Sequence, residues 1–284
     1  MSTDDGDPPA NGTNSTEHGA DVDLPITIAT LDETETYRVL LTATNWATLE
    51  HAYGFAAEAP KRLAELLAPD QSTRTKALSH LHHTLHHQNT LYEATVPAAL
   101  CVAAMLPNPR VSRTVDENHD SFPGCMRTEL LLWIASVADA VTDEVDVLRR
   151  RHGFPLADYP PAVGIQQIRP QLYSAAVAYV DDTDREVAEA AITACMRLLD
   201  DPRLLHHRTA LVPAIRQTLG TSDRWQHRGQ AIDTLDAWGE DSTGLEGQRN
   251  PFLFCDTDKD TDTPTDSAPR PVDTNEGYSE PPPF

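Results

Sequence analysis

The sequence predicts an all-α fold, an α-solenoid of about four helix pairs between two acidic tails. Three observations predict it. Apolar side chains recur at helical spacing through the middle of the chain, one short pattern appears four times, and the charge divides the chain into three parts. We expect a disordered acidic tail over residues 1–36, a helical repeat domain over 37–243, and a disordered tail rich in Pro, Asp and Thr over 244–284.

The acidic charge lies mostly at the two ends of the chain. The 284 residues include 44 acidic and 22 basic side chains, for a formal charge of -22. Residues 1–37 contribute -9 and residues 240–284 contribute -8, which leaves -5 for residues 38–239. Because the end segments have too little apolar surface to offset the entropy of ordering, we expect them to be disordered.

The compartment is predicted by elimination. The N-terminus is acidic where a signal peptide needs a basic region and an apolar core, and the longest apolar run, 96–106, is too short to cross a bilayer. We therefore expect a cytoplasmic protein with no membrane partner. The four cysteines show no CxxC spacing, and Cys101 and Cys195 lie in apolar helical stretches. Both are expected to be buried as small hydrophobic residues.

A short pattern marks the first helix of each predicted pair. It first appears as Arg74-x-x-Ala77-Leu78-x-x-Leu81, and it recurs at residues 127–134, 188–195 and 228–235. Small or apolar residues at this spacing let a helix pack closely on its neighbours. The pattern therefore predicts four equivalent helices.

A proline marks the second helix in the first three pairs. Pro97, Pro170 and Pro213 each precede an apolar run and lie between successive copies of the first pattern. Proline fits the start of a helix, because the N–H groups there have no intrahelical acceptor. Without two insertions, at 107–126 and 144–165, the period falls to about 40 residues, the length of a HEAT-type helix pair. One insertion separates two repeats and the other lies within a repeat, so we expect them on opposite edges of the stack.

The run HQNTLYEAT, residues 87–95 followed by Pro97, resembles the signature of a family of bacterial HEAT-repeat proteins. In that family a similar sequence follows the first repeat helix. The resemblance covers about residues 46–239. It implies an α-solenoid and brings no set of catalytic residues.

Five histidines lie within residues 80–87. On a regular helix His82 and His86 would flank the buried side, while His80, His83 and His87 would point away from it. His82 with His86, and His83 with His87, have a spacing that can chelate a metal. No third ligand completes such a site, so we predict no metal and no cofactor.

The turn after the histidines has two structural explanations. Asn89 can take the left-handed conformation that ends a helix. The next helix can then begin with a capping box formed by Thr90 and Glu93, or with Thr95 as its N-cap. The functional alternative is that side chains of this turn contact a partner.

The second insertion is the densest basic segment of the chain. Its arginines are either a solvated helix end or a docking site for something acidic, such as a protein partner or the chain's own tail. The candidate partner-binding residues are therefore His87, Gln88 and Tyr92 in the turn, and Arg149, Arg150, Arg151 and His152 in the insertion.

The predicted function is a non-catalytic, protein-binding scaffold or adaptor, because stacked helix pairs expose a long surface suited to proteins or peptides. We predict that the chain is not an enzyme, since it has no P-loop, GxGxxG or GxSxG motif. One alternative is a toxin-neutralising or regulatory protein with one dedicated partner. Another is a nucleic-acid enzyme similar to HEAT-like DNA glycosylases, but a charge of -5 over 38–239 argues against binding to nucleic acid. The oligomeric state is left open.

Overall fold

The computed structural model describes residues 35–115 and 124–245. Nearly all of the two predicted acidic tails, 1–36 and 244–284, therefore lies outside the described residues, as does part of the first insertion. The described residues are mostly helical, which confirms the all-α prediction. Within them, no helix is both long enough and apolar enough to cross a membrane.

The first part of the chain, residues 35–105, combines helices with one short hairpin. The elements are α1 (Thr36–Ala43), η1 (Trp46–Thr48), β1 (Glu50–His51), β2 (Gly54–Phe55), α2 (Ala59–Glu65), α3 (Gln71–His80), the π-helix η2 (Leu81–Leu85), the 3-10 turn η3 (His87–Asn89) and α4 (Thr95–Met105).

The remaining elements are again helical apart from a second hairpin. They are η4 (Pro109–Ser112), β3 (Thr114–Val115), β4 (Gly124–Cys125), α5 (Met126–Asp139), α6 (Asp143–Arg151), η5 (Leu156–Asp158), α7 (Pro160–Val177), α8 (Arg185–Leu198), η6 (Leu205–His207), α9 (Arg208–Ala214), the π-helix η7 (Ile215–Leu219) and α10 (Trp225–Trp238). Both hairpins are antiparallel two-stranded sheets, which the helical periodicity did not predict.

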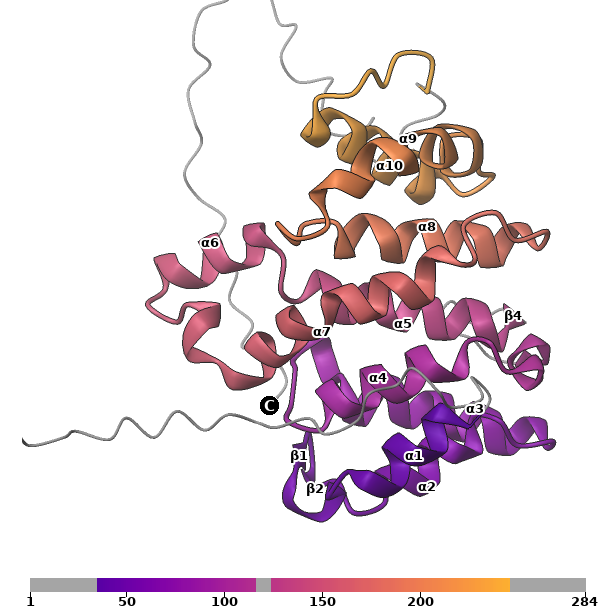
Figure 1. Ribbon diagram of the computed structural model, residues 1–284, viewed down its shortest axis with the longest axis vertical. Coiled ribbons are helices and arrows are strands. Elements are labelled where there is room, and N and C mark those ends of the chain that lie inside the picture. The colour runs from indigo at the N-terminus through magenta and orange to yellow at the C-terminus, as the bar shows by residue number, and fades with distance from the viewer. Residues whose placement is uncertain (1–34, 116–123, 246–284) are drawn as a thin grey trace, which may run out of the picture.

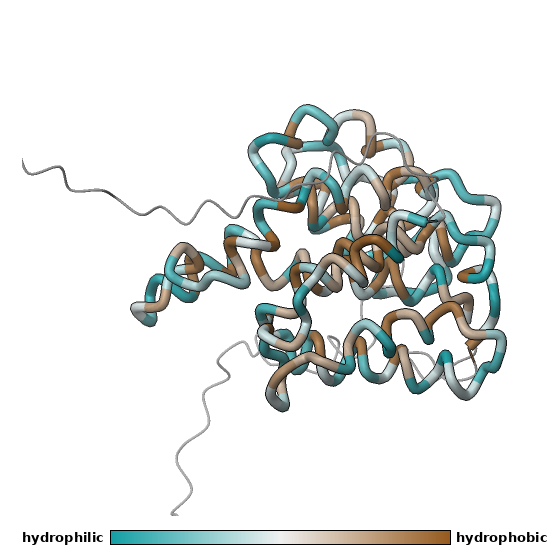
Figure 2. Tube along the Cα trace, turned by 60° about the horizontal axis from the view of Figure 1, so that its bottom comes forward, coloured by the Kyte–Doolittle hydropathy of each residue, from teal (hydrophilic) through white to brown (hydrophobic). Residues whose placement is uncertain are grey.

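Alternate helices pack side by side in two rows (Figure 1). In the first row α5 packs on α8, and α8 on α10; in the second row α1 packs on α4, and α4 on α7. The rows are joined where α4 contacts α5 and where α7 contacts both α5 and α8. Hydrophobic positions gather between the helices, as the brown segments in Figure 2 show.

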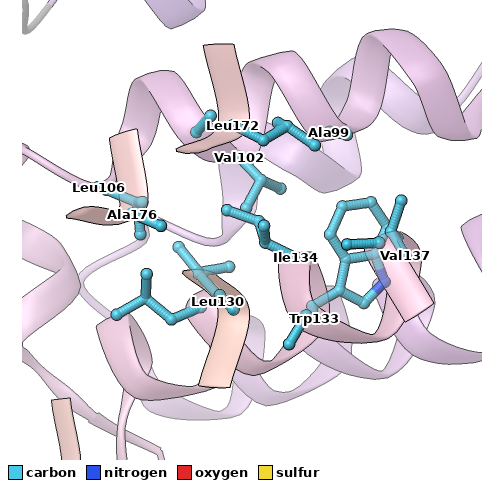
Figure 3. Close-up of a cluster of buried hydrophobic side chains, with 14 of the residues drawn as sticks. Ala99, Val102, Leu106, Leu130, Trp133, Ile134, Val137, Leu172 and Ala176 are labelled. Carbon is cyan, nitrogen blue, oxygen red and sulfur yellow. The ribbon is translucent and has the colours of Figure 1, made fainter. Parts of the chain in front are cut away.

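The centre of the core lies where α4, α5 and α7 meet (Figure 3). Trp133 is fully buried, and its indole N–H donates to the carbonyl of Leu81 at 3.1 Å, so α5 is tied to η2. Cys101 and Cys195 are also fully buried, as predicted. Burial raises the pKa of the Cys101 thiol to about 12, which keeps the thiol protonated.

The arginine of the recurring pattern binds carbonyl groups around the start of its helix. Arg74 is buried and donates to the carbonyls of Ala68, Pro69 and Thr114 at 2.6 to 3.0 Å. Arg228, at the equivalent position of α10, donates to the carbonyl of Ser222, six residues earlier. The pattern therefore encodes the loop before the helix as well as its packing face.

Only one of the three marker prolines lies where the sequence predicted it. Pro97 is in the first turn of α4, whereas Pro170 lies deep inside α7 and Pro213 inside α9. A proline inside a helix removes the hydrogen bond to the carbonyl four residues earlier. At Pro170 that carbonyl belongs to Gln166, and Arg203 donates to it at 2.6 Å. A side chain thus replaces the missing backbone donor.

The two insertions lie on opposite edges of the molecule, as predicted (Figure 1). The first insertion includes η4 and the hairpin of β3 and β4. The second forms α6, η5 and the first turns of α7, and it projects from the body as the arm at the left of Figure 2.

Candidate functional site

The two groups of candidate residues lie on the same edge of the molecule. Tyr159, directly after η5, donates its hydroxyl to the carbonyl of Leu91 in the turn of residues 87–95. The guanidinium of Arg149 lies 5.2 Å from the centre of the Tyr159 ring, in a cation-π contact. We call this region the α6 edge; it comprises the β1–β2 hairpin, residues 87–95 and residues 143–159.

The helix before the turn ends as a π-helix because groups outside it bind its carbonyls. Trp133 donates to Leu81, as described above, and the backbone N–H of Ala52 in the hairpin donates to the carbonyl of Thr84 at 3.1 Å. The carbonyl of Leu85 accepts from the Thr95 hydroxyl at 2.5 Å. Such π-turns occur often at functional sites.

The backbone of the turn is left-handed at two consecutive residues. Asn89 has φ 58°, which confirms its predicted conformation, and Gln88 has φ 49°. Non-glycine residues rarely adopt this region, and a bulky side chain such as glutamine does so at a cost. Gln88 is exposed and so presents its side chain outward from a fixed backbone.

Neither predicted cap forms at the start of α4. Glu93 accepts a hydrogen bond from the backbone N–H of Glu50 at 3.2 Å, so it fastens the hairpin instead of closing a capping box. Thr95 accepts from the N–H of Tyr92 at 2.8 Å while it donates to Leu85. The helix begins after Ala94 without a side-chain cap. Long-range contacts thus use the side chains that local rules assign to capping.

The five histidines differ in exposure: His86 is buried, His83 is exposed, and His80, His82 and His87 are half-buried. His86 is buried, with ring nitrogens 3.2 Å from the Thr90 carbonyl and 3.1 Å from Ser136 Oγ. Burial lowers the pKa of His86 and also that of His80, which favours the neutral imidazoles. His80, which was predicted to point away from the apolar stripe, is half-buried against the hairpin, while His83 is exposed.

The hairpin covers the predicted outward side of this helix. The ring of His51 lies 6.0 Å from that of His80, and the ring of Tyr53 lies 5.7 Å from that of His87. His87 is half-buried as a result. His51 accepts the N–H of Tyr53 on Nδ1 at 3.1 Å and donates from Nε2 to Glu58 at 2.6 Å.

A metal site is not assembled by these side chains. Across residues 35–115 and 124–245, no group of three or more His, Cys, Asp or Glu residues has the geometry to hold a metal ion. The histidines instead join the hairpin to the turn through ring contacts and hydrogen bonds. They act as packing residues of the edge.

The arm of the second insertion is held together by its own charges. Asp146 accepts from Arg150 at 2.6 Å and from the backbone N–H of Leu156 at 2.9 Å, and these two bonds lower its pKa. Arg149 donates to the carbonyl of Phe154 at 3.1 Å. Two of the predicted partner-binding arginines therefore also stabilise the arm, whereas Arg151 is exposed at its tip.

The rest of the arm's tip is also exposed. His152 follows Arg151 directly, and Gly153 has φ 82°, a conformation that lets the chain reverse there. Tyr92 is half-buried in the turn below. The structure thus places Gln88, Arg151 and His152 where a partner could reach them.

The α6 edge exposes large apolar side chains that were not predicted as part of a site. The exposed fractions are 69% for Tyr53, 64% for Phe55, 50% for Val147, 54% for Leu148 and 67% for Phe154. In the described residues, the only other exposed large hydrophobic residue is Leu205 on η6. The available sequence signal was the pair Val147-Leu148 inside a highly charged helix, where no apolar stripe continues into the body.

Comparison with known proteins gives no relative: no known protein family, curated protein or solved structure matches the chain.

Proposed function

We propose that this protein is a non-catalytic scaffold of HEAT-like helix pairs that binds a protein partner through the α6 edge. The two rows of equivalent helices support the repeat architecture, because α4 packs on α7 as α5 packs on α8. Two arginines of the recurring pattern support it too, because Arg74 and Arg228 each bind a carbonyl of the loop before their helix. In such arrays each pair contacts mainly its neighbours, and the edges and faces remain available for recognition.

The clustering of exposed apolar side chains carries this proposal. Five of the six exposed large hydrophobic residues in the described parts of the chain lie on the hairpin and the arm. Single exposed apolar residues are normal, but a gathered set marks an interaction site. Aromatic side chains are also enriched at protein interfaces, where they bury a large area with little loss of conformational entropy.

The partner's chemistry follows from the charges next to the apolar residues. Arg151 and His152 are exposed at the tip of α6, and Arg150 is exposed although it pairs with Asp146. Exposed ion pairs of this kind contribute little to stability, so the arginine can exchange its own aspartate for a partner's carboxylate. We therefore expect an acidic partner surface with apolar side chains that cover Leu148 and Phe154.

Site-specific crosslinking tests the proposal. A photoreactive phenylalanine analogue is introduced in the native cell at position 148 or 53, and in a parallel strain at position 205 as a matched exposed control. We expect positions 148 and 53 to crosslink to the same protein and position 205 not to do so. The crosslinked protein is then purified and its affinity for the full chain is measured.

Substitutions separate a binding surface from a solvated one. Leu148→Asp and Phe154→Asp should each lower the affinity for the purified partner at least tenfold, while Leu205→Asp leaves this affinity unchanged. All three variants should keep the wild-type circular dichroism spectrum, since these side chains are exposed. Equal affinities for the arm variants and the control would refute the proposal.

A further inference from the structure

A groove crosses the first row of helices and shares none of its lining residues with the α6 edge. It has a volume of about 690 Å³, within the range of roughly 300 to 1,000 Å³ typical of ligand pockets. Polar residues of three successive first-row helices line it: Ser136 and Asp139 of α5, Thr193 and Arg197 of α8, and Gln226 and Gln230 of α10. The lining is thus supplied by three successive units of the array.

Two arginines give the groove its cationic groups. Arg197 Nε lies 3.1 Å from Asp139, and Arg224 lies 3.5 Å from Glu186. All four side chains are more than a third exposed, so these pairs are weak and solvated. A guanidinium has five N–H donors in a planar fork, so Arg197, which holds Asp139 through Nε, can bind a second carboxylate through its other nitrogens.

Gln230 supplies an unmet hydrogen-bonding group in the same wall. Its Oε1 atom is buried and has no hydrogen-bond partner among the described residues. A buried amide oxygen without a donor is unfavourable, so a ligand that donates an N–H would be favoured there. A peptide group offers both a donor and an acceptor, and it can satisfy the glutamine amide in either orientation.

The wall around Gln230 is held in place by buried charges. His227 lies between Gln226 and Gln230 in the lining, and its Nδ1 is 3.0 Å from Glu189. Glu189 is buried and also accepts from Arg185 at 3.0 Å. The bond between His227 and Glu189 fixes α10 against α8, so the groove is formed before any ligand arrives.

We propose that this groove binds an extended acidic segment of a protein partner. Arg197 and Arg224 bind its carboxylates, and Gln230 binds one of its backbone amide groups. The site goes beyond the proposed function, because it uses none of the α6-edge residues. It shares with that function only the class of partner, and either proposal can fail without the other.

Charge distribution favours a peptide over a nucleic acid. The two arginines alternate with the carboxylates of Asp139 and Glu186, whereas a phosphate backbone requires an unbroken series of cations. An acidic peptide presents its charges on separate side chains and leaves its amide groups free for Gln230. Binding of a nucleic acid is therefore an outcome that would contradict the proposal.

Fluorescence anisotropy with synthetic probes tests the groove directly. The full chain is titrated into a fluorescein-labelled peptide of alternating glutamate and serine, and into a lysine–serine peptide and an oligothymidylate of equal length. We expect saturable binding of the glutamate peptide only, weakened by added salt. Arg197→Gln and Arg224→Gln should each weaken it about tenfold, and the double variant more strongly.

Three further variants locate the site. Gln226→Trp should block binding without removing a charge, since Gln226 is an exposed lining residue. Arg110→Gln removes an exposed arginine outside the groove, and Arg149→Gln removes a half-buried arginine from the α6 edge; both variants should bind as the wild type does. Thermal melts monitored by circular dichroism check that each variant is folded.

Several outcomes would overturn the proposal. The first is that the glutamate peptide shows no saturable binding at low salt. The second is that the double arginine variant binds this peptide as tightly as the wild type does. The third is that the oligothymidylate binds more tightly than the glutamate peptide. An equal loss in Arg110→Gln would also overturn it, because it would show attraction by general charge. None of these results bears on crosslinking through position 148.

Discussion

Helices α5 and α6 follow one another in the chain but differ strongly in how many of their residues are buried. α5 buries ten of its fourteen residues, whereas none of the nine residues of α6 is buried. Both nevertheless carry large apolar side chains. For α5 the fold itself accounts for them, since they meet α4, α7 and α8. For α6 the fold does not, and its exposed apolar residues belong to the gathered set on the α6 edge that marks an interaction site.

The largest expected effect is on the α5 side of this comparison. Trp133→Ala should lower the free energy of unfolding by about 3 to 5 kcal/mol, because it leaves a cavity and an unpaired Leu81 carbonyl. Urea unfolding followed by circular dichroism measures the loss. A change below about 1 kcal/mol would mean that α5 is not the packed centre of the molecule.

A second variant tests the polar part of the packed region. Burial alone would raise the pKa of Glu189, but hydrogen bonds from His227 and Arg185 outweigh it and lower that pKa to about 2. A solvated glutamate has a pKa of about 4.3, so folding favours the charged form above that pH. Glu189→Gln should cost about 2 kcal/mol at neutral pH.

The pH dependence gives the sign of this effect. The contribution of Glu189 is complete above about pH 4.3 and is lost as the pH falls towards 2, where the carboxyl is protonated. The stabilities of wild type and Glu189→Gln should therefore converge in that window. A difference that stays constant from neutral pH to about pH 2 would contradict the charged interaction.

A third variant acts on the joint between the two regions. Tyr159→Phe removes the hydroxyl that donates to Leu91 and should cost about 1 kcal/mol. Because the bond joins the arm to the turn, amide hydrogen exchange should quicken in 143–159 and remain unchanged in α5. Uniform exchange changes in both helices would show that the arm is not a separate unit.

The smallest expected effect is on α6. Leu148→Ala should change the free energy of unfolding by less than about 0.5 kcal/mol, since the side chain is mostly exposed. The same thermal and urea measurements apply. A loss comparable to that of Trp133→Ala would show that α6 is covered within the folded monomer, and the α6 edge would then not be a docking surface.

The buried face of α5 could be predicted from the sequence, because the helical spacing of its apolar residues determines it. The stripe of Leu130, Leu131 and Ile134 predicted a buried helical face, and all three are buried. The approximate positions of both insertions also followed from repeat spacing. The position of Pro170 did not, since Arg203, distant in sequence, supplies the donor that a local rule treats as missing.

The site was predicted only in part, because tertiary contacts assemble it. Gln88 and Arg151 are exposed as a partner contact requires, but nothing in the sequence indicated that Tyr159 would join their segments. The capping roles of Glu93 and Thr95 were wrong for a similar reason, as each binds a distant backbone group. The groove of the first row has no sequence signature, since its residues come from separate helices.

The bond from the Trp133 indole to the Leu81 carbonyl has a consequence for how the packed helices unfold. In a linear array the terminal unit can fray first while its neighbours stay folded. Here unfolding of the N-terminal helices would break this bond and expose the buried Trp133 side chain of α5 to water, at a cost of about 1.5 to 3 kcal/mol. Separate loss of the N-terminal helices is therefore disfavoured, and they should unfold together with α5 as one cooperative block.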